Sequence, residues 1–180
     1  MRVIAGSARR VPLVAPKGQN TRPTADRVKE NMFNIIAADV PGARFLDLFC
    51  GSGAIGIEAL SRGAGAAVFA DISRDAISAL NANLARAKFP GRVMPICALA
   101  AIAALEREGA GFDFIFLDPP YGQGLLDRAL DALGGSSILL PEGMIIAECH
   151  KDEPIPGAGQ LVLQDIREYG GTRLMFYGRY

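Results

Sequence analysis

From residue 44 onward, short apolar runs alternate with segments whose apolar residues recur every three or four positions. The apolar runs cover residues 45–49, 67–70, 92–96, 112–117 and 144–149, and the helical patterns cover residues 54–62, 75–88, 99–107 and 125–133. Strands that are apolar throughout are typical of a parallel sheet that is buried on both faces. The pattern therefore predicts an α/β fold in which helices cover both faces of a mostly parallel sheet.

The end of the chain has a different pattern. Leu161–Tyr169 and Thr172–Tyr180 are two extended runs, and Gly170-Gly171 between them is a turn signal. Together they predict a β-hairpin. A parallel sheet that ends in an antiparallel hairpin differs from the usual dinucleotide-binding layout.

The beginning of the chain predicts short extended pieces rather than a helix. Val3–Ala5 and Val11–Val14 are apolar, and Pro12 and Pro16 disfavour a helix there. We expect residues 1–22 to form a β-hairpin or a loose arm, separate from a single domain over residues 23–180.

A helix is expected to follow this arm. Thr24 is placed to cap its first turn, and Pro41-Gly42 ends the segment. Its predicted apolar face is formed by Val28, Met32, Ile35 and Ile36.

Composition narrows the class of protein. The chain has 180 residues, of which 50% are hydrophobic and 21% charged, which suits one globular domain. No apolar run approaches the roughly 18 residues of a membrane span, and the first residues lack the apolar core of a secretory signal. The three cysteines show no metal-site spacing, so we expect a cytoplasmic protein without a disulfide framework or a bound metal.

Charge is unevenly distributed although the formal net charge is zero. Residues 1–30 hold seven basic and two acidic side chains, whereas the remaining 150 residues hold 12 basic and 17 acidic ones. A basic arm on a mildly acidic body suggests a polyanionic partner. A solvated tail that improves solubility is the alternative interpretation.

A glycine-rich loop follows the first apolar run. Residues 51–56 read Gly-Ser-Gly-Ala-Ile-Gly, and Asp71 lies 20 residues after Gly51, at the end of the next predicted strand. Glycines allow a ligand to approach the backbone, and a carboxylate at that strand end accepts ribose hydroxyls. The loop suits a nicotinamide dinucleotide or S-adenosylmethionine (SAM), and turn glycines without a ligand also produce this pattern.

Asp47 favours SAM. It lies in the first predicted strand, four residues before Gly51. A carboxylate there binds an ammonium group, directly or through water, and repels a pyrophosphate. An Asp that only caps the following loop is the alternative.

Asp118-Pro119-Pro120-Tyr121 follows the fourth predicted strand. In open α/β sheets ligands bind at this carboxyl edge, which also carries the glycine loop. The prolines fix the backbone, so the Asp118 carboxylate and the Pro119 carbonyl are held as acceptors for the two N–H bonds of an exocyclic amine. Tyr121 offers a ring on which a base stacks. This combination predicts methyl transfer to a base amine, and a proline-rich turn with a packing Tyr is the alternative.

These motifs resemble those of Class I SAM-dependent methyltransferases that modify base amines. The whole chain is similar to the bacterial 16S rRNA guanine-N2 methyltransferase family of the small ribosomal subunit. The similarity runs through residues 2–6, 22–30, 33–34 and 56–64 to Tyr169-Gly170-Gly171-Thr172-Arg173-Leu174. It implies a seven-stranded sheet with an antiparallel last strand.

The resemblance also implies site residues. Asp118, Pro119 and Tyr121 would hold the target guanine, and the arm would contact RNA. The implied cofactor residues are Asp47, Phe49, Gly51, Ser52, Gly53, Asp71, Ile72, Cys97 and Ala98, and the implied RNA contacts are Arg9, Arg10, Arg22, Thr24, Arg27 and Tyr121. The implied partner is 16S rRNA, within an assembled small-subunit particle, bound by a monomeric enzyme that releases S-adenosylhomocysteine (SAH).

Two positions depart from the family pattern. The arm reads Arg9-Arg10-Val11 where the family usually has Arg-Gly-Arg. Cys97 stands where the family often has Asp or Asn, so we expect backbone groups of Cys97 and Ala98 to contact the adenine of SAM.

Other readings remain open at this point. The same motifs serve adenine-N6 methyltransferases of RNA or DNA, and the glycine loop suits a nicotinamide-dependent oxidoreductase. A non-catalytic RNA-binding factor of ribosome assembly is a third alternative. Cys50 is interpreted as a packing residue and His150 as a surface residue.

Overall fold

The computed structural model describes residues 1–16 and 23–179, without the side chains of residues 23–25. Within them the chain forms one seven-stranded sheet with the order β3-β2-β1-β4-β5-β7-β6. The strands are β1 (Arg44–Leu48), β2 (Ala66–Ala70), β3 (Arg92–Met94), β4 (Phe112–Leu117), β5 (Leu139–His150), β6 (Val162–Tyr169) and β7 (Thr172–Gly178). The strands β1 to β5 pair in parallel, and β7 is antiparallel to both of its neighbours. The predicted sheet and its terminal hairpin are confirmed.

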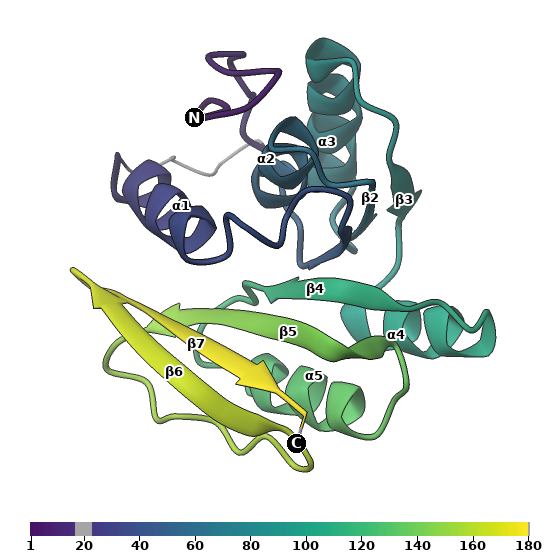
Figure 1. The fold of residues 1–180 in the computed structure, drawn as a ribbon, viewed down its shortest axis with the longest axis vertical. Coiled ribbons are helices and arrows are strands. Elements are labelled where there is room, and N and C mark those ends of the chain that lie inside the picture. Colours follow the sequence, from purple (N-terminus) through teal and green to yellow (C-terminus); the bar gives the residue numbers. More distant parts are fainter. Residues whose placement is uncertain (17–22, 180) are drawn as a thin grey trace.

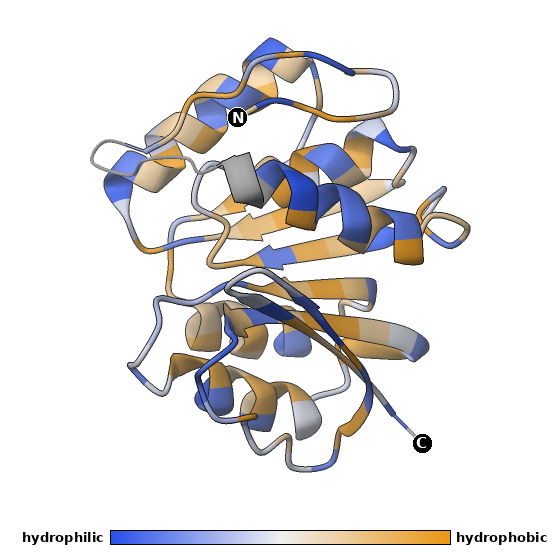
Figure 2. Cartoon of the chain, turned by 90° about the vertical axis from the view of Figure 1, so that its left-hand side faces the viewer, coloured by the Kyte–Doolittle hydropathy of each residue, from blue (hydrophilic) through white to orange (hydrophobic). Residues whose placement is uncertain are grey.

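Helices cover both faces of this sheet (Figure 1). One apolar layer contains α1 (Pro23–Ile35), α2 (Ala54–Ser61) and α3 (Arg74–Ala87), and the other contains α4 (Ala98–Arg107) and α5 (Leu125–Gly134). Successive strand residues enter opposite layers, as Phe45 and Leu46 do in β1. This burial on both sides explains why the central strands are hydrophobic along most of their length (Figure 2), whereas the edge strand β6 is only partly buried.

The N-terminal segment packs on the body of the protein. Val3, Ala8 and Leu13 are buried in the layer of α1, α2 and α3. The backbone forms an isolated antiparallel bridge between Arg2 and Pro12 and hydrogen bonds that link Val3 with Arg10 and Val11, but residues 1–16 contain no strand. The β-hairpin predicted for this segment is therefore not confirmed, and residues 1–16 are not loose.

A buried carboxylate holds the segment in place. Glu58 on α2 is inaccessible to solvent, and its oxygens accept hydrogen bonds from the backbone N–H groups of Ile4 and Ala5 at 2.8 and 2.9 Å. Lys29 and Arg62 balance its charge, at 3.4 and 2.8 Å. Burial lowers the pKa of Lys29. Because Lys29 is buried in this ion pair, it does not add to the exposed positive charge of the arm.

Two details of the first helix differ from the prediction. It begins at Pro23, which suits the first helical position, so Thr24 lies inside the helix and is not its cap. Ile35 is 43% exposed, whereas Phe33 is buried. Phe33 stacks on Phe45 with ring centroids 6.2 Å apart. The buried face of the helix therefore includes Phe33 in place of Ile35.

The described helices are short. The longest, α3, has 14 residues. In residues 1–16 and 23–179, no helix has the length and apolar character needed to cross a membrane.

Candidate active site

Four carboxylates lie at the carboxyl edge of the sheet, on the face that α1, α2 and α3 cover. Asp47, Asp71, Asp118 and Glu148 each stand two positions after a side chain buried in that layer, namely Phe45, Phe69, Phe116 and Ile146. Since strand side chains alternate between faces, the four point the same way. They come from four adjacent strands, in the order β2, β1, β4 and β5.

The glycine loop is tied to Asp71. One carboxylate oxygen accepts a hydrogen bond from the Gly51 N–H at 2.8 Å, and the other accepts one from the Ser73 N–H at 2.8 Å. Phe49 and Gly51 both have positive φ, 60° and 52°, so the chain turns sharply between β1 and α2. The carboxylate predicted to hold ribose hydroxyls is thereby fixed in orientation, and each oxygen keeps a further lone pair for a ligand.

Packing accounts for two of the glycines. A Cβ on Gly53, which has φ 75°, would lie 2.3 Å from Leu80 Cδ1, and one on Gly56 would lie 2.3 Å from Phe69 Cε1. The close approach of α2 to Phe69 of β2 therefore favours glycine at position 56, and the positive φ and the contact with α3 favour it at position 53, whether or not a ligand binds. Gly51 has open space around it, so a ligand that approaches the loop backbone meets no obstacle at that position.

Asp47 also binds backbone. The residue is 1% exposed, and its Oδ2 accepts a hydrogen bond from the Gly56 N–H at 2.9 Å. Burial, followed by the charges of Asp118 and Asp71, raises its pKa. The capping role weighed as an alternative is thus present in the structure, and the predicted contact with an ammonium group stays a prediction.

The other predicted cofactor residues surround this loop. Ile72 is 75% exposed beside Asp71. Cys97 is exposed at the N-cap position of α4, whose first residue is Ala98. Ser52 is buried, and its carbonyl oxygen accepts a hydrogen bond from Asn83 Nδ2 at 2.9 Å.

Asn83 was not identified from the sequence. Its side chain is buried on α3 and also exchanges hydrogen bonds with the backbone of Val14, at 2.8 and 2.9 Å. It therefore links the N-terminal segment to the glycine loop. No local pattern signals this role, because both partners are distant in the sequence.

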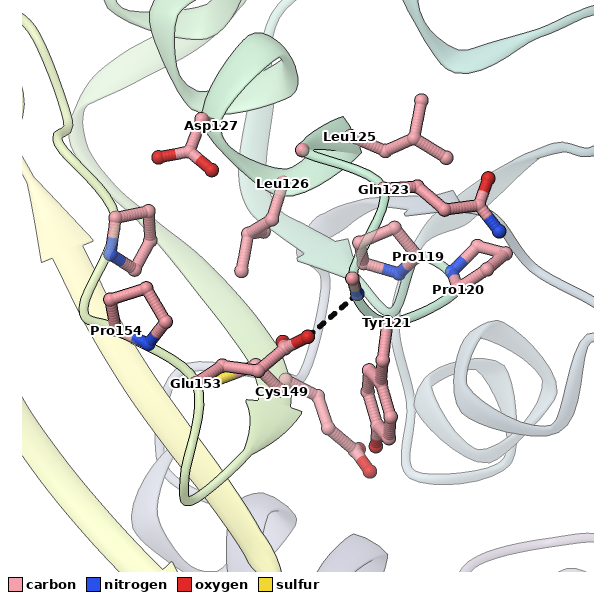
Figure 3. Close-up of a pocket in the computed structure, with 14 residues that line it drawn as sticks. Pro119, Pro120, Tyr121, Gln123, Leu125, Leu126, Asp127, Cys149, Glu153 and Pro154 are labelled. Carbon is pink, nitrogen blue, oxygen red and sulfur yellow. Dashed lines mark hydrogen bonds between the residues drawn. The ribbon is translucent and has the colours of Figure 1, made fainter.

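The Asp-Pro-Pro-Tyr motif borders a pocket of about 250 Å³ (Figure 3). Its walls come from the segment between β4 and α5 and from the end of β5 with the loop that follows, and they include Pro119, Pro120, Tyr121, Glu148 and Glu153. Glu153 accepts a hydrogen bond from the Gly122 N–H at 2.7 Å, which joins the two walls. The structure thus brings Pro119 and Tyr121 to one concave site, whereas Asp118 is not among the residues that line it.

Tyr121 presents its ring to this site. The residue is 47% exposed, and in Figure 3 its ring projects away from the Pro119–Pro120 turn. Its ring centroid lies 6.2 Å from that of His150, with the planes tilted by 59°. A half-exposed aromatic ring at the mouth of a pocket is suited to stacking on a planar ligand.

Asp118 and Glu148 are acidic residues at the neighbouring ends of β4 and β5. Burial by surrounding protein raises the pKa of Asp118 to about 6, although solvent reaches its side chain and moderates the effect. Burial and the charge of Asp118 raise the pKa of Glu148 to about 8. Sequence analysis missed Glu148, which stands in an ordinary strand pattern, and only pairing of β4 with β5 identifies it.

The predicted RNA contacts are only partly described. Arg9, Arg10 and Arg27 are exposed, and Arg10 has φ 73°. Arg22 lies outside the described residues, as does the side chain of Thr24. Exposed guanidinium groups are available to phosphates, and the RNA contacts stay a prediction.

Two further residues match their interpretation. Cys50 is buried, and burial with the charge of Asp47 raises the pKa of its thiol, which makes it a poor nucleophile. His150 is on the surface, with 45% of its side chain exposed. Among the described residues, no group of three or more His, Cys, Asp or Glu side chains is arranged to hold a metal ion.

Comparison with known proteins finds one family model and several rRNA methyltransferases that match most of the chain. The family model described as "Conserved hypothetical protein 95" matches residues 1–178. The chain is 39% identical over 180 residues to "Putative rRNA methyltransferase YlbH" of Bacillus subtilis, and the match covers 98% of both chains. It is 36% identical over 156 residues to "Ribosomal RNA small subunit methyltransferase D" of Escherichia coli K12, covering 87% of this chain and 78% of the relative.

Solved structures show the same architecture. "Putative methyltransferase yhhF from Escherichia coli" superimposes with a TM-score of 0.87 at 31% identity, over 99% of this chain and 97% of that one. SMU.776, a methyltransferase structure with bound SAH, has a TM-score of 0.70 at 15% identity, over 87% of this chain and 50% of that one. The second likeness concerns the fold alone, which is that of Class I methyltransferases.

Proposed function

Because the chain belongs to the family described as conserved hypothetical protein 95, and its relatives include rRNA methyltransferases, we propose that it methylates the exocyclic N2 amine of a guanine in 16S rRNA. SAM supplies the methyl group as an electrophile, and SAH is the product. The observation that carries the proposal is the position of Asp118-Pro119-Pro120-Tyr121, beside the glycine loop at one edge of the sheet.

The residues of the glycine-loop half fit SAM. A ligand with ribose hydroxyls and a positive charge finds acceptors at Asp71 and a negative field from Asp71 and Asp118, the charges that also raise the pKa of Asp47. The same field opposes the pyrophosphate of a nicotinamide dinucleotide, so the oxidoreductase reading loses support. Ile72, exposed beside Asp71, is placed to pack against the adenosine.

The residues of the base half position the amine. The Asp118 carboxylate and the Pro119 carbonyl would each accept one N–H of the amine, which favours a pyramidal nitrogen with its lone pair directed at the methyl carbon. When bound, SAM would supply a methyl group that leaves without the electrons of its bond to sulfur, and the amine nitrogen that accepts it would become positive. Asp118 stabilises that charge and accepts the proton, because its raised pKa of about 6 still leaves it largely ionised at pH 7.

RNA would be held largely by the exposed arginines. Arg9, Arg10 and Arg27 suit phosphates, and Tyr121 suits a base that has left its stack. We place the enzyme in the cytoplasm as a monomer that acts on an assembled small-subunit particle. The adenine-N6 alternative shares this chemistry, whereas an intact amine-binding motif disfavours the non-catalytic assembly factor.

The test is methylation of small-subunit particles taken from cells that lack this protein. Labelled methyl groups from SAM should enter 16S rRNA as N2-methylguanosine, identified by mass spectrometry. Naked 16S rRNA and large-subunit particles serve as controls. N6-methyladenosine as the product would support the adenine alternative, and the absence of any transfer would contradict the proposal.

The role of the arm has a separate test. Replacing Arg9 and Arg10 by Ala should weaken particle binding and reduce the slope of affinity against salt concentration, because fewer counterions are released. SAH binding, measured by calorimetry, should not change. An unchanged salt slope would show that these arginines do not contact phosphates.

A further inference from the structure

Glu148 occupies a position next to Asp118 that the function described so far does not use. Leu117 of β4 pairs with Ala147 of β5, so Asp118 and Glu148 are the next residues of two neighbouring parallel strands. Phe116 and Ile146 lie in the same layer, and alternation therefore directs both carboxylates toward one face. Glu148 also lines the pocket together with Pro119 and Tyr121.

No side chain satisfies this carboxylate within the described ranges. Neither Glu148 nor Asp118 accepts a hydrogen bond or forms an ion pair there. The other charged groups nearby are already engaged: Glu153 binds the Gly122 N–H, and Arg173 of β7 binds Glu168 and two backbone carbonyls. Asp47 on β1 is a further buried carboxyl group near Asp118, and His150 contacts Tyr121. The carboxylates of Asp118 and Glu148 thus lie on neighbouring strands without a hydrogen-bond donor among the described residues.

The edge of a guanine supplies the missing donors. Its ring N1–H and one N–H of its exocyclic amine are adjacent and point the same way, whereas adenine presents an amine N–H beside a bare N1 acceptor. We propose that Glu148 accepts the N1–H of the target guanine beside the amine N–H held by Asp118, so that the pair selects guanine over adenine. This inference rests on the proposed function and gives the choice of base a physical origin in this chain.

Protonation would then control the selection. Burial and the charge of Asp118 hold the pKa of Glu148 at about 8, so this carboxyl is mostly neutral at pH 7 before the base enters. Two guanine donors favour the doubly ionised pair, and guanine binding releases a proton. A neutral Glu148 carries a donor that suits the N1 acceptor of adenine instead. Selectivity for guanine should therefore increase with pH.

The experiment compares two target bases. Small-subunit particles are reconstituted with either guanine or adenine at the methylated position. The kcat/KM for methylation of each particle is then measured from pH 6 to 9. For the wild type, the guanine rate should rise about tenfold or more between pH 6.5 and 8.5. In Glu148→Gln the amide donates to adenine as readily as it accepts from guanine. The ratio of kcat/KM for guanine to that for adenine should therefore fall about tenfold or more. The guanine rate of this variant should stop rising near pH 6–7, because Glu148 no longer titrates.

Controls separate this proposal from the function itself. Glu142→Gln, an exposed carboxylate on the same strand, should match the wild type in both rate and pH profile. If Glu148→Gln keeps the wild-type base ratio and pH profile, the proposal is wrong even though wild-type methylation upholds the function. If Glu148→Gln does not bind SAH, Glu148→Asp carries the test. Its shortened carboxylate should lower the guanine rate about fivefold or more while keeping the pH dependence, and an unchanged rate overturns the proposal.

Discussion

The acidic residues in the two halves of the carboxyl edge differ in their hydrogen bonds. In the half formed by β1 and β2, backbone N–H groups bind the carboxylates of Asp47 and Asp71 at 2.8–2.9 Å. In the half formed by β4 and β5, Asp118 and Glu148 have no such partner among the described residues, and both have raised pKa values. The first half is fixed before a ligand arrives, whereas the second is left for a ligand to complete.

This difference separates binding from chemistry. A cofactor that binds in every catalytic cycle is best received by groups already held in place, since no reorganisation is then needed. Acceptors for a reacting amine serve another purpose, because their interaction must strengthen as positive charge develops. Substitutions in the two halves should therefore produce different kinetic signatures.

The largest effect is expected from Asp118→Ala. Removing an acceptor that faces developing charge should lower single-turnover methylation of particles at least ~100-fold, while SAH affinity changes little. Rapid-quench kinetics and calorimetry measure the two quantities. Near-normal turnover with lost SAH binding would assign Asp118 to the cofactor half and contradict the comparison.

Asp71→Ala should produce the opposite pattern. The change removes an acceptor for ribose hydroxyls and also frees the Gly51 and Ser73 N–H groups, so SAH binding should weaken by about 1–3 kcal/mol. Turnover at saturating SAM should fall much less. Asp75→Ala, an exposed acidic residue in the first turn of α3, is the matched control and should leave affinity unchanged.

Stability should respond to pH through Glu148. Because its folded pKa is raised to about 8 from 4.5, Glu148 opposes folding progressively as pH rises through that interval. Glu148→Gln should therefore be no more stable than the wild type at pH 4, and clearly more stable than the wild type at pH 8.5. Thermal unfolding at the two pH values measures this, with Glu142→Gln as control. A pH-independent difference would mean that Glu148 is not buried beside a like charge.

The smallest effects are expected at Tyr121. Tyr121→Ala should raise the KM for particles about tenfold through lost stacking, which corresponds to ~1.4 kcal/mol. Tyr121→Phe should be nearly silent, since the ring and not the hydroxyl provides the stacking surface. A large increase of the KM in Tyr121→Phe would indicate that the hydroxyl binds the substrate. The base half would then contain a third polar group besides Asp118 and Glu148.

The sequence predicted the strands and helices of the sheet because their patterns are local. Apolar runs and glycine turns gave β1 to β7 nearly to the residue, although β5 begins at Leu139, five residues before the predicted start. The packing of the N-terminal segment on the body was not predicted, because Glu58 and Asn83, which bind it, lie more than fifty residues away in the sequence. Glu148 was missed for the same reason, since its importance comes from a neighbouring strand.

The order of strands in the sheet has a consequence for synthesis. Within residues 1–16 and 23–179, β6 pairs only with β7, which is made after it and which joins β6 to β5. While the ribosome is still adding residues 172–178, β6 has no place in the sheet and β5 has an open edge. The edge of β5 bears Ile145, Ile146 and Ala147, an apolar stretch that favours association with other chains until it is covered. Insertion of β7 between β5 and β6 is therefore the step that closes this side of the sheet.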